Sequence, residues 1–407
     1  MRNGPGDPPI SLGLTMRGVE KLKMDDVKQN PMYPFLIVLT ISSTIGLQTW
    51  QTLINNFAVE AAHLDGGHIG AIQSVREIPG FLSLLVIFTL YFIKEHRLTT
   101  MSTIVLGVGL MAIGLLPSFN GLLLTTIVTS IGFHYFDTTS RSLTLQYFDS
   151  KISPWVFGKL RSYTAAASIA AGILIYIIAP IMNYTQIYIL MGFLVLSAGI
   201  WGCTKDPTHM GTTPQHRRII FKKKYWLFYF LTFMGGARRQ IFVAFAAFLL
   251  VQRHQFSLQT ITLLFALNNL VNFFFSPIVG KAIIRFGERK ILSLEYFGLT
   301  IIFLSYTSTD SRLLLTLLYI LDHLFFNFSM GILTYFQKVA DPRDIAPSMA
   351  AGNTINHIAA VALPFIGGLL WIVDYRIPFL IGAGLSLISL IIVQMMRVPA
   401  EVTQDPT

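Results

Sequence analysis

The chain has 407 residues, of which 53% are hydrophobic and 12% are charged, and its formal net charge is +10. An ordinary soluble domain carries roughly 25% charged residues, so this composition excludes a soluble enzyme with one membrane anchor and indicates an integral membrane protein. The single cysteine, Cys203, excludes a disulfide framework and a thiol-rich metal cluster.

Residues 1–30 lack a continuous apolar core, so they predict a cytoplasmic tail instead of a cleavable secretory signal. Twelve apolar segments follow, each long enough at 1.5 Å per residue to cross a hydrocarbon layer of about 30 Å. The sequence therefore predicts an all-α protein with twelve transmembrane helices. These are expected at 33–58, 67–93, 98–116, 121–147, 157–182, 186–203, 225–251, 259–280, 290–308, 313–337, 347–371 and 377–396.

The positive charges follow the predicted membrane topology. Of the 30 Lys and Arg residues, 22 fall in the N-terminal tail, the C-terminal tail and the loops, with their helix ends, on the same side as the tails. The opposite loops hold only Arg253, Arg312 and Arg376. By the positive-inside rule both termini are cytoplasmic, and the basic charge gives no reason to expect nucleic acid as a partner. The remaining five arginines lie within predicted helices: Arg76, Arg141, Arg161, Arg238 and Arg239.

A polar insertion divides the chain into two similar halves. The prediction is a six-helix bundle over 31–203, a basic linker over 204–224, a second bundle over 225–398 and a cytoplasmic tail over 399–407. Three stretches match between the halves at nearly constant offset: "YPFLIVLT" with "YWLFYFLT", "FHYFDTTS" with "DHLFFNFS", and "SIAAG" with "HIAAV". Such matches in the same order indicate internal duplication.

The duplicated organisation and one loop motif resemble the major facilitator superfamily. The motif is "GKAIIRFGERK", in which Gly280, Arg285, Gly287, Arg289 and Lys290 fall in the expected places, while Ile284 stands where the family has Asp. The resemblance implies two six-helix bundles related by pseudo-two-fold symmetry. Independently, the two glycines permit close approach and a tight turn, and the basic residues can face helix carbonyls and anionic lipid. The motif is either a conformational loop or a topology signal.

The adjacent arginines Arg238 and Arg239 lie roughly 20 Å into the seventh helix, too deep to reach the near interface. In the repeat alignment they precede Gln240, which matches Gln48 at the level of a central cavity. Neighbouring helical residues point about 100° apart, so we expect one arginine to bind an anionic group and the other to be held between helices. Arg238 is favoured for the cavity because Gly235 opens that face. The alternative is that both form structural ion pairs.

Further charged residues are expected near mid-membrane. Arg76 and Glu77 precede Pro79 and Gly80, which indicate a kink, and Glu77 is a candidate proton carrier or counter-ion. His134, Asp137 and Arg141 share one helix face, which either lines the translocation path or joins helices. These residues alone are too few ligands to indicate a metal site.

The second half supplies the remaining candidates. Asp322 is its only mid-membrane carboxylate and is preferred as the proton-coupling acid over Glu77 and Asp137, with His323 beside it. Arg161 and Glu295 lie near predicted helix starts and are expected at the interface. The polar residues considered for substrate binding in this half are Asn268, Asn269 and His357.

We therefore expect a proton-coupled secondary transporter that works by alternating access on a small organic anion or zwitterion. A carboxylate, an acidic metal chelator and a phosphorylated metabolite all fit five arginines within the predicted helices that are opposed by three carboxylates. The alternatives are efflux of hydrophobic or cationic drugs and transport of a lipid. No enzymatic motif occurs. We expect no cofactor and no metal, a monomer in the lipid bilayer, and location in a bacterial inner membrane.

Overall fold

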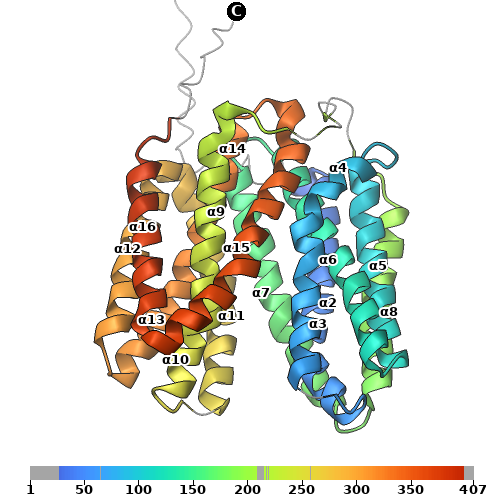
Figure 1. Cartoon of the computed structure of the whole chain (residues 1–407). Coiled ribbons are helices and arrows are strands. Elements are labelled where there is room, and N and C mark those ends of the chain that lie inside the picture. Colours follow the sequence, from blue (N-terminus) through green and yellow to red (C-terminus); the bar gives the residue numbers. More distant parts are fainter. Residues whose placement is uncertain are drawn as a thin grey trace, which may run out of the picture.

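A computed structural model describes residues 27–64, 66–208, 215, 216, 218, 220–256 and 258–397. Helices account for nearly all of this part of the chain, and they form two bundles that stand side by side (Figure 1). The all-α prediction is confirmed for these residues. The predicted tail over 399–407 and most of the tail over 1–30 lie outside them.

The first bundle contains six membrane segments, of which the second is interrupted. Pro79 lies inside α3 near its end, and a tight 3₁₀ turn, η1, joins the two parts of this segment. Asn183 and Gln186 form a capping box that begins the last helix. The elements are α2 (Met32–Glu60), α3 (Gly66–Phe81), η1 (Leu82–Leu85), α4 (Val86–Thr89), α5 (Glu95–Leu115), α6 (Phe119–Tyr147), α7 (Ser153–Ile178) and α8 (Tyr184–Cys203).

The second bundle repeats this pattern with more interruptions. Its first segment contains a π-helical turn, η3, and its fourth contains a 3₁₀ turn, η4. The elements are η2 (Lys223–Tyr225), α9 (Trp226–Ile241), η3 (Phe242–Ala246), α10 (Ala247–Gln252), α11 (Leu258–Phe286), α12 (Glu288–Ser308), α13 (Arg312–Phe325), η4 (Phe326–Ser329), α14 (Met330–Val339), η5 (Pro342–Asp344), α15 (Ile345–Val373) and α16 (Arg376–Val393).

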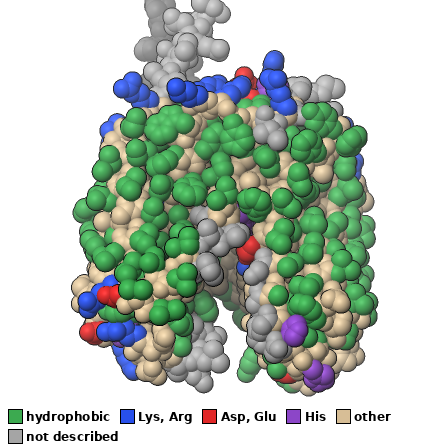
Figure 2. All heavy atoms as spheres, in the orientation of Figure 1, with side chains coloured by type: hydrophobic (Ala, Val, Ile, Leu, Met, Phe, Trp, Pro, Cys, Tyr) green, Lys and Arg blue, Asp and Glu red, His purple; other side chains and the backbone are tan. Residues whose placement is uncertain are grey.

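Apolar side chains cover the outside of both bundles. Within the described part of the chain, ten segments are long and apolar enough to cross a membrane. The helices α6 and α15, each of 29 residues, complete the twelve, and α6 is more polar than the other spans because it contains many Ser and Thr residues. Figure 2 shows hydrophobic side chains around the flanks, Lys and Arg along the upper end, and a smaller cluster of charged side chains at the lower left. This distribution fits a surface that faces lipid.

The two bundles touch closely at the end where α2 begins and α16 ends. A Cβ atom on Gly280 of α11 would lie 2.3 Å from the carbonyl oxygen of Pro154, at the start of α7. A Cβ on Gly158 would likewise lie 2.5 Å from the carbonyl oxygen of Ser276. Only glycine fits such a backbone contact, so Gly280 makes the close approach predicted from its motif. Gly287 has φ of 81°, which is the turn conformation expected of it.

Gln337 links the bundles at the same end. From α14, its Nε2 donates to the carbonyl oxygens of Leu145 (2.7 Å) and Phe148 (2.6 Å), which lie at the C-terminal end of α6. Its Oε1 accepts a hydrogen bond from Ser153 Oγ at 2.5 Å. A single amide thus satisfies helix-end groups of the opposite bundle, and these bonds must break if the bundles separate here.

We expect Gln337→Ala to make separation at this end several-fold more frequent, because each hydrogen bond contributes about 0.5–1.5 kcal/mol. The measurement is the rate at which a membrane-impermeant thiol reagent labels Ser162→Cys in a Cys203→Ser background. Ser162 Oγ donates to the carbonyl oxygen of Phe273 in the opposite bundle, so its site opens only when the bundles part. Gln394→Ala is the control, since Gln394 bonds to Arg289 and Ser293 within one bundle. Equal labelling in both variants contradicts the assignment.

The linker is fixed to the second bundle through Asp344. This buried carboxylate receives Lys222 Nζ at 2.5 Å and His216 Nδ1 at 2.8 Å, and the Tyr225 hydroxyl donates to it as well. Burial by itself raises the pKa of Asp344, but these hydrogen bonds and the charge of Lys222 outweigh burial and lower the pKa. The stabilisation is therefore present above the pKa of an unfolded Asp and is lost as pH falls through the lowered value.

We expect Asp344→Asn to loosen the linker at neutral pH, because the amide cannot replace the charged acceptor. The measurement is hydrogen–deuterium exchange in the segment 215–225, which should become faster than in the parent chain. Lowering the pH through the depressed pKa of Asp344 should have the same effect on the parent but little on the variant. Unchanged exchange in the variant would show that Asp344 does not hold the linker.

Candidate functional site

A cavity of about 1030 Å³ lies between the two bundles and is lined by side chains from both. Figure 2 shows the hollow between the halves at the end away from the termini. Three residues predicted from the sequence to bind substrate or couple protons do not line it: Asn268, Asn269 and His323. The other substrate-binding and proton-coupling candidates do line it: Gln48, Arg76, Glu77, His134, Asp137, Arg141, Arg238, Arg239, Gln240, Asp322 and His357.

Arg76 and Glu77 form an ion pair on α3, immediately before Pro79. Glu77 Oε1 accepts hydrogen bonds from Arg76 Nη2 at 2.5 Å and from Arg76 Nε at 3.1 Å. The guanidinium also lies 5.0 Å from the ring centre of Trp50 on α2. Arg76 is therefore neutralised by its sequence neighbour and held against an aromatic face.

A second ion pair, between Arg141 and Asp137, lies on α6. Arg141 Nε donates to Asp137 Oδ1 at 3.0 Å, and Arg141 Nη2 lies 3.0 Å from Asp137 Oδ2. The pair follows from the i, i+4 spacing on one helix face. Because both side chains are partly exposed to the cavity, Arg141 remains accessible to a bound molecule.

Arg238 is held inside the second bundle. Its side chain is only 3% exposed, its Nη2 lies 3.8 Å from Glu295 Oε1, and its Nη1 donates to the hydroxyl of Ser389. Its guanidinium also lies 4.4 Å from the ring centre of Tyr296. The prediction that Glu295 lies at the interface is wrong, because two turns into α12 its carboxylate is buried opposite Arg238.

Arg239 differs from its neighbour. It is half-buried, it lines the cavity, and no ion pair to it is found among the described residues. Its electrostatic neighbours, Arg141, Glu77 and Asp137, belong to the opposite bundle. Both arginines line the cavity, but the turn of about 100° between adjacent residues lets Arg238 pair with Glu295 within the bundle and leaves Arg239 the more exposed of the two. The π-helical turn η3 follows directly, as is frequent at functional sites.

Arg161 also lines the cavity, so the interface position predicted for it is wrong. Its guanidinium lies 5.0 Å from the ring centre of Phe326 in the opposite bundle. The cavity therefore extends toward the start of α7, where Arg161 was expected to lie at the membrane interface. Arg161 therefore adds positive charge to the cavity wall.

Asp322 of α13 is the second buried carboxyl group that the second bundle contributes to the cavity wall, beside Glu295. It is 5% exposed, and its Oδ2 has no hydrogen-bond partner among the described residues. Arg238 and Glu295 are its charged neighbours. His323, although adjacent, turns away and contacts Asn272 at 2.8 Å, inside an amide network that continues to Asn327.

His134 and His357 meet where the bundles come together. Their ring centres lie 4.6 Å apart, and His357 Nδ1 lies 3.3 Å from Glu77 Oε2. One turn away, Asn353 Nδ2 donates to Ser83 Oγ at 2.7 Å and to Thr138 Oγ1 at 3.1 Å. The repeat alignment pairs His134 with His323, but the spatial partner is His357.

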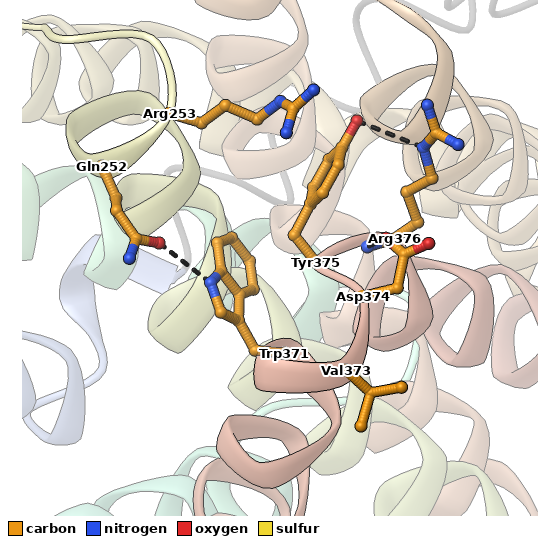
Figure 3. Close-up of a pocket in the computed structure, with 7 residues that line it drawn as sticks. All are labelled: Gln252, Arg253, Trp371, Val373, Asp374, Tyr375 and Arg376. Carbon is orange, nitrogen blue, oxygen red and sulfur yellow. Dashed lines mark hydrogen bonds between the residues drawn. The ribbon is translucent and has the colours of Figure 1, made fainter.

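A smaller hollow of about 620 Å³ lies at the outer end of the second bundle (Figure 3). Trp371 Nε1 donates to Gln252 Oε1 at 2.9 Å, and Arg376 Nε donates to the hydroxyl of Tyr375 at 3.2 Å. Arg253 lies 4.1 Å from the ring centre of Tyr375. Its polar groups bond to one another where the ends of α10 and α15 meet the start of α16. We therefore interpret this hollow as a gap in the packing of helix ends and not as a ligand site.

The comparisons with known proteins agree with this architecture. The family model described as "Major Facilitator Superfamily" matches residues 35–336 and 226–407. A search of curated proteins finds no match. Three solved structures that the chain resembles are the human organic anion transporter MFSD10, a bacterial homologue of the iron transporter ferroportin in its outward-facing state, and the transporter FucP in the outward conformation.

Each of these structures superposes with a TM-score of 0.72. Sequence identities are 11%, 12% and 11%, covering 89%, 90% and 90% of this chain and 99%, 99% and 98% of those chains, respectively. At such identities the likeness establishes the fold of twelve helices in two related bundles. Together with the family match, it places the chain among transporters and not among enzymes. The chain belongs to the major facilitator superfamily.

Proposed function

We propose that the protein moves a small organic anion through the cavity between the bundles, with Arg239 as the main ligand of the negative group. The observation that carries the proposal is the charge pairing of the cavity wall. Arg76, Arg141 and Arg238 each have a carboxylate partner, whereas none is found for Arg239 in the described part of the chain. A cation so placed is stabilised by an anionic substrate.

The remaining wall fits such a substrate. The cavity volume of about 1030 Å³ suits a small molecule. Arg161 supplies a second positive charge, and Gln48 and Gln240 supply amides for polar groups of the substrate. A carboxylate, an acidic metal chelator and a phosphorylated metabolite each present the charge that two guanidinium groups recognise. Efflux of cationic drugs is disfavoured because five arginines face four carboxylates here.

One of the structures with the same fold is described as an organic anion transporter. At 11% identity this likeness supports the fold alone, so the proposal rests on the arginines of this chain. Transport would proceed by alternating access, in which the bundles part at the Gln337 end while the opposite end closes. With both termini cytoplasmic, as the positive charges favour, the cavity opens to the outside of the cell. We place the protein as a monomer in a bacterial inner membrane.

Proton coupling is assigned to Asp322. Burial away from water favours the neutral form of a carboxyl group, while Arg238 favours the charged form. The balance between protonated and ionised Asp322 therefore changes when Arg238 or Glu295 moves. Since all three residues lie on the cavity wall, substrate entry and protonation act on the same cluster.

The test is transport by the purified protein in lipid vesicles. We expect radiolabelled carboxylates or phosphorylated metabolites to exchange across the membrane, and an imposed pH gradient to drive their accumulation. Asp322→Asn should keep exchange but lose accumulation driven by the gradient, whereas Asp310→Asn, at an exposed outer loop, should behave as the parent. Transport of cations or neutral lipids with no anion transport would overturn the proposal. Accumulation by Asp322→Asn would overturn the coupling assignment alone.

A further inference from the structure

Three side chains capable of binding a metal converge at the junction of the bundles. Glu77 of α3, His134 of α6 and His357 of α15 each offer one ligand atom, and these atoms all lie within 4.8 Å of one another. The two imidazole rings are nearly perpendicular, at 88°. We propose that this cluster binds a divalent transition-metal ion such as Zn²⁺.

The spacing of the ligand atoms suits a shared ion better than a direct ion pair. Zinc binds histidine nitrogen and carboxylate oxygen at about 2.0–2.2 Å, so two neighbouring ligands of a tetrahedral ion lie roughly 3.3 Å apart. His357 Nδ1 and Glu77 Oε2 are 3.3 Å apart. A charge-assisted hydrogen bond between them would be about 2.7–2.9 Å. The ligand atom of His134 lies within 4.8 Å of both.

The imidazoles are poorly satisfied in this place, although each histidine is only 6% exposed. His134 Nδ1 has no hydrogen-bond partner among the described residues, and His357 Nδ1 has only the long contact of 3.3 Å with Glu77 Oε2. Buried polar atoms without partners are rare and costly, and each such atom calls for an explanation. A metal ion held by both rings removes the cost.

The carboxylate is oriented for the same task. Arg76 engages only Glu77 Oε1, so Oε2 is left to face His357. A hydrogen-bonded neighbour that fixes a ligating carboxylate is typical of protein metal sites. Two neutral histidines and one carboxylate are a ligand set for Zn²⁺ and Fe²⁺ that leaves positions open. Since all three side chains line the cavity, an open position is reachable from it.

Gly80 provides the space that the cluster occupies. A Cβ atom at this position would lie 2.8 Å from His134 Cε1 and 2.8 Å from both Cε1 and Nδ1 of His357. Gly80→Ala therefore leaves every ligand in the chain but forces the two rings apart. This variant tests whether metal binding depends on the arrangement of the ligands, because the three ligands themselves are unchanged.

The site joins the two bundles. Glu77 and His134 belong to the first bundle and His357 to the second, and the bonds of Asn353 to Ser83 and Thr138 hold α15 against them. The ligand set is therefore complete only while these helices touch. A bound ion stabilises this arrangement of the bundles and slows its exchange with others.

The test uses the full chain without an affinity tag, in detergent, with CoCl₂ or ZnCl₂ as the only added ligand. We expect one Co²⁺ per chain with visible absorption typical of nitrogen and oxygen ligands, and a rise in Tm on addition of Zn²⁺. His134→Gln, His357→Gln and Gly80→Ala should each weaken binding at least tenfold and abolish the rise in Tm. His323→Gln, a buried histidine outside the cluster, should retain both.

Two outcomes overturn the proposal. One is a parent chain that binds no Co²⁺ and gains no Tm from Zn²⁺, a result that needs no variant to fold. The other is binding that His134→Gln and His357→Gln leave unchanged, which would place the metal elsewhere. Monodispersity and the metal-free Tm of each variant establish that the comparison is between folded proteins.

Discussion

Replacing Arg238 with methionine is expected to destabilise the folded protein by about 3–5 kcal/mol, because it leaves Glu295 charged and buried without a partner. Both side chains are 3% exposed, so little water reaches the carboxylate while the pair is intact. Asp322, a second buried carboxyl group, loses the same cation. The measurement is the free energy of unfolding in detergent, or the Tm where unfolding is irreversible.

The matched control is the double variant Arg238→Met with Glu295→Gln. Removing both charges eliminates the uncompensated one, so most of the lost stability should return. Glu295→Gln alone should cost less than Arg238→Met, since Ser389 and the Tyr296 ring continue to engage Arg238. Additive losses in the double variant would show that the two residues do not form an energetic pair.

Replacing Arg239 with alanine is expected to reduce anion transport about tenfold to hundredfold, with little change in stability. Hydrogen bonds to charged groups contribute about 1.5–3 kcal/mol each, and 1.4 kcal/mol corresponds to a factor of ten. Stability should persist because no carboxylate partner of Arg239 is found in the described residues, so none is left unpaired. Initial rates of exchange in lipid vesicles provide the measurement.

Arg253→Ala serves as the control for this variant. Arg253 lies against Tyr375 at the outer surface, away from the cavity, and its loss should leave the transport rate unaltered. Arg239→Lys should restore only part of the rate, because an ammonium cannot reproduce the two-pronged contact of a guanidinium with a carboxylate or phosphate. A normal rate in Arg239→Ala would remove Arg239 from the substrate site.

The architecture was predictable because several independent sequence patterns, each extending over whole helices, indicate the same fold. Twelve apolar segments, the bias of Lys and Arg to one side and the matched stretches of the two halves all concern whole helices. The close contact of Gly280 and the turn at Gly287 were predictable as well, since glycine at these positions has a direct steric meaning.

The partners within the cavity were harder to predict because they depend on helix rotation and inter-bundle contacts. Depth along a helix placed Glu295 and Arg161 near the interface, yet both face the interior. Gly235 favoured Arg238 for the cavity, whereas the geometry now favours Arg239 as the substrate ligand. The positions of α12, which brings Glu295 and Tyr296 to Arg238, and of α16, which brings Ser389, distinguish the two neighbours.

The cluster of Glu77, His134 and His357 could not be found by motif spacing. Its members come from two helices of one half and one helix of the other, and internal duplication pairs His134 with a different histidine. Gln337, which bonds to the opposite bundle, gave no sequence signal either, since a glutamine near a helix end is ordinarily exposed. One signal was available for the cluster: Gly80, next to Pro79, marked a place where another helix approaches.

Binding of an anionic substrate by Arg239 can be measured directly as ligand-induced stabilisation. The Tm of the parent, Arg239→Ala and Arg253→Ala is measured as a function of the concentration of the anion that exchanges fastest in vesicles. We expect a saturable rise in Tm for the parent and for Arg253→Ala, and no rise for Arg239→Ala over the same range. Equal rises in all three proteins would contradict this assignment.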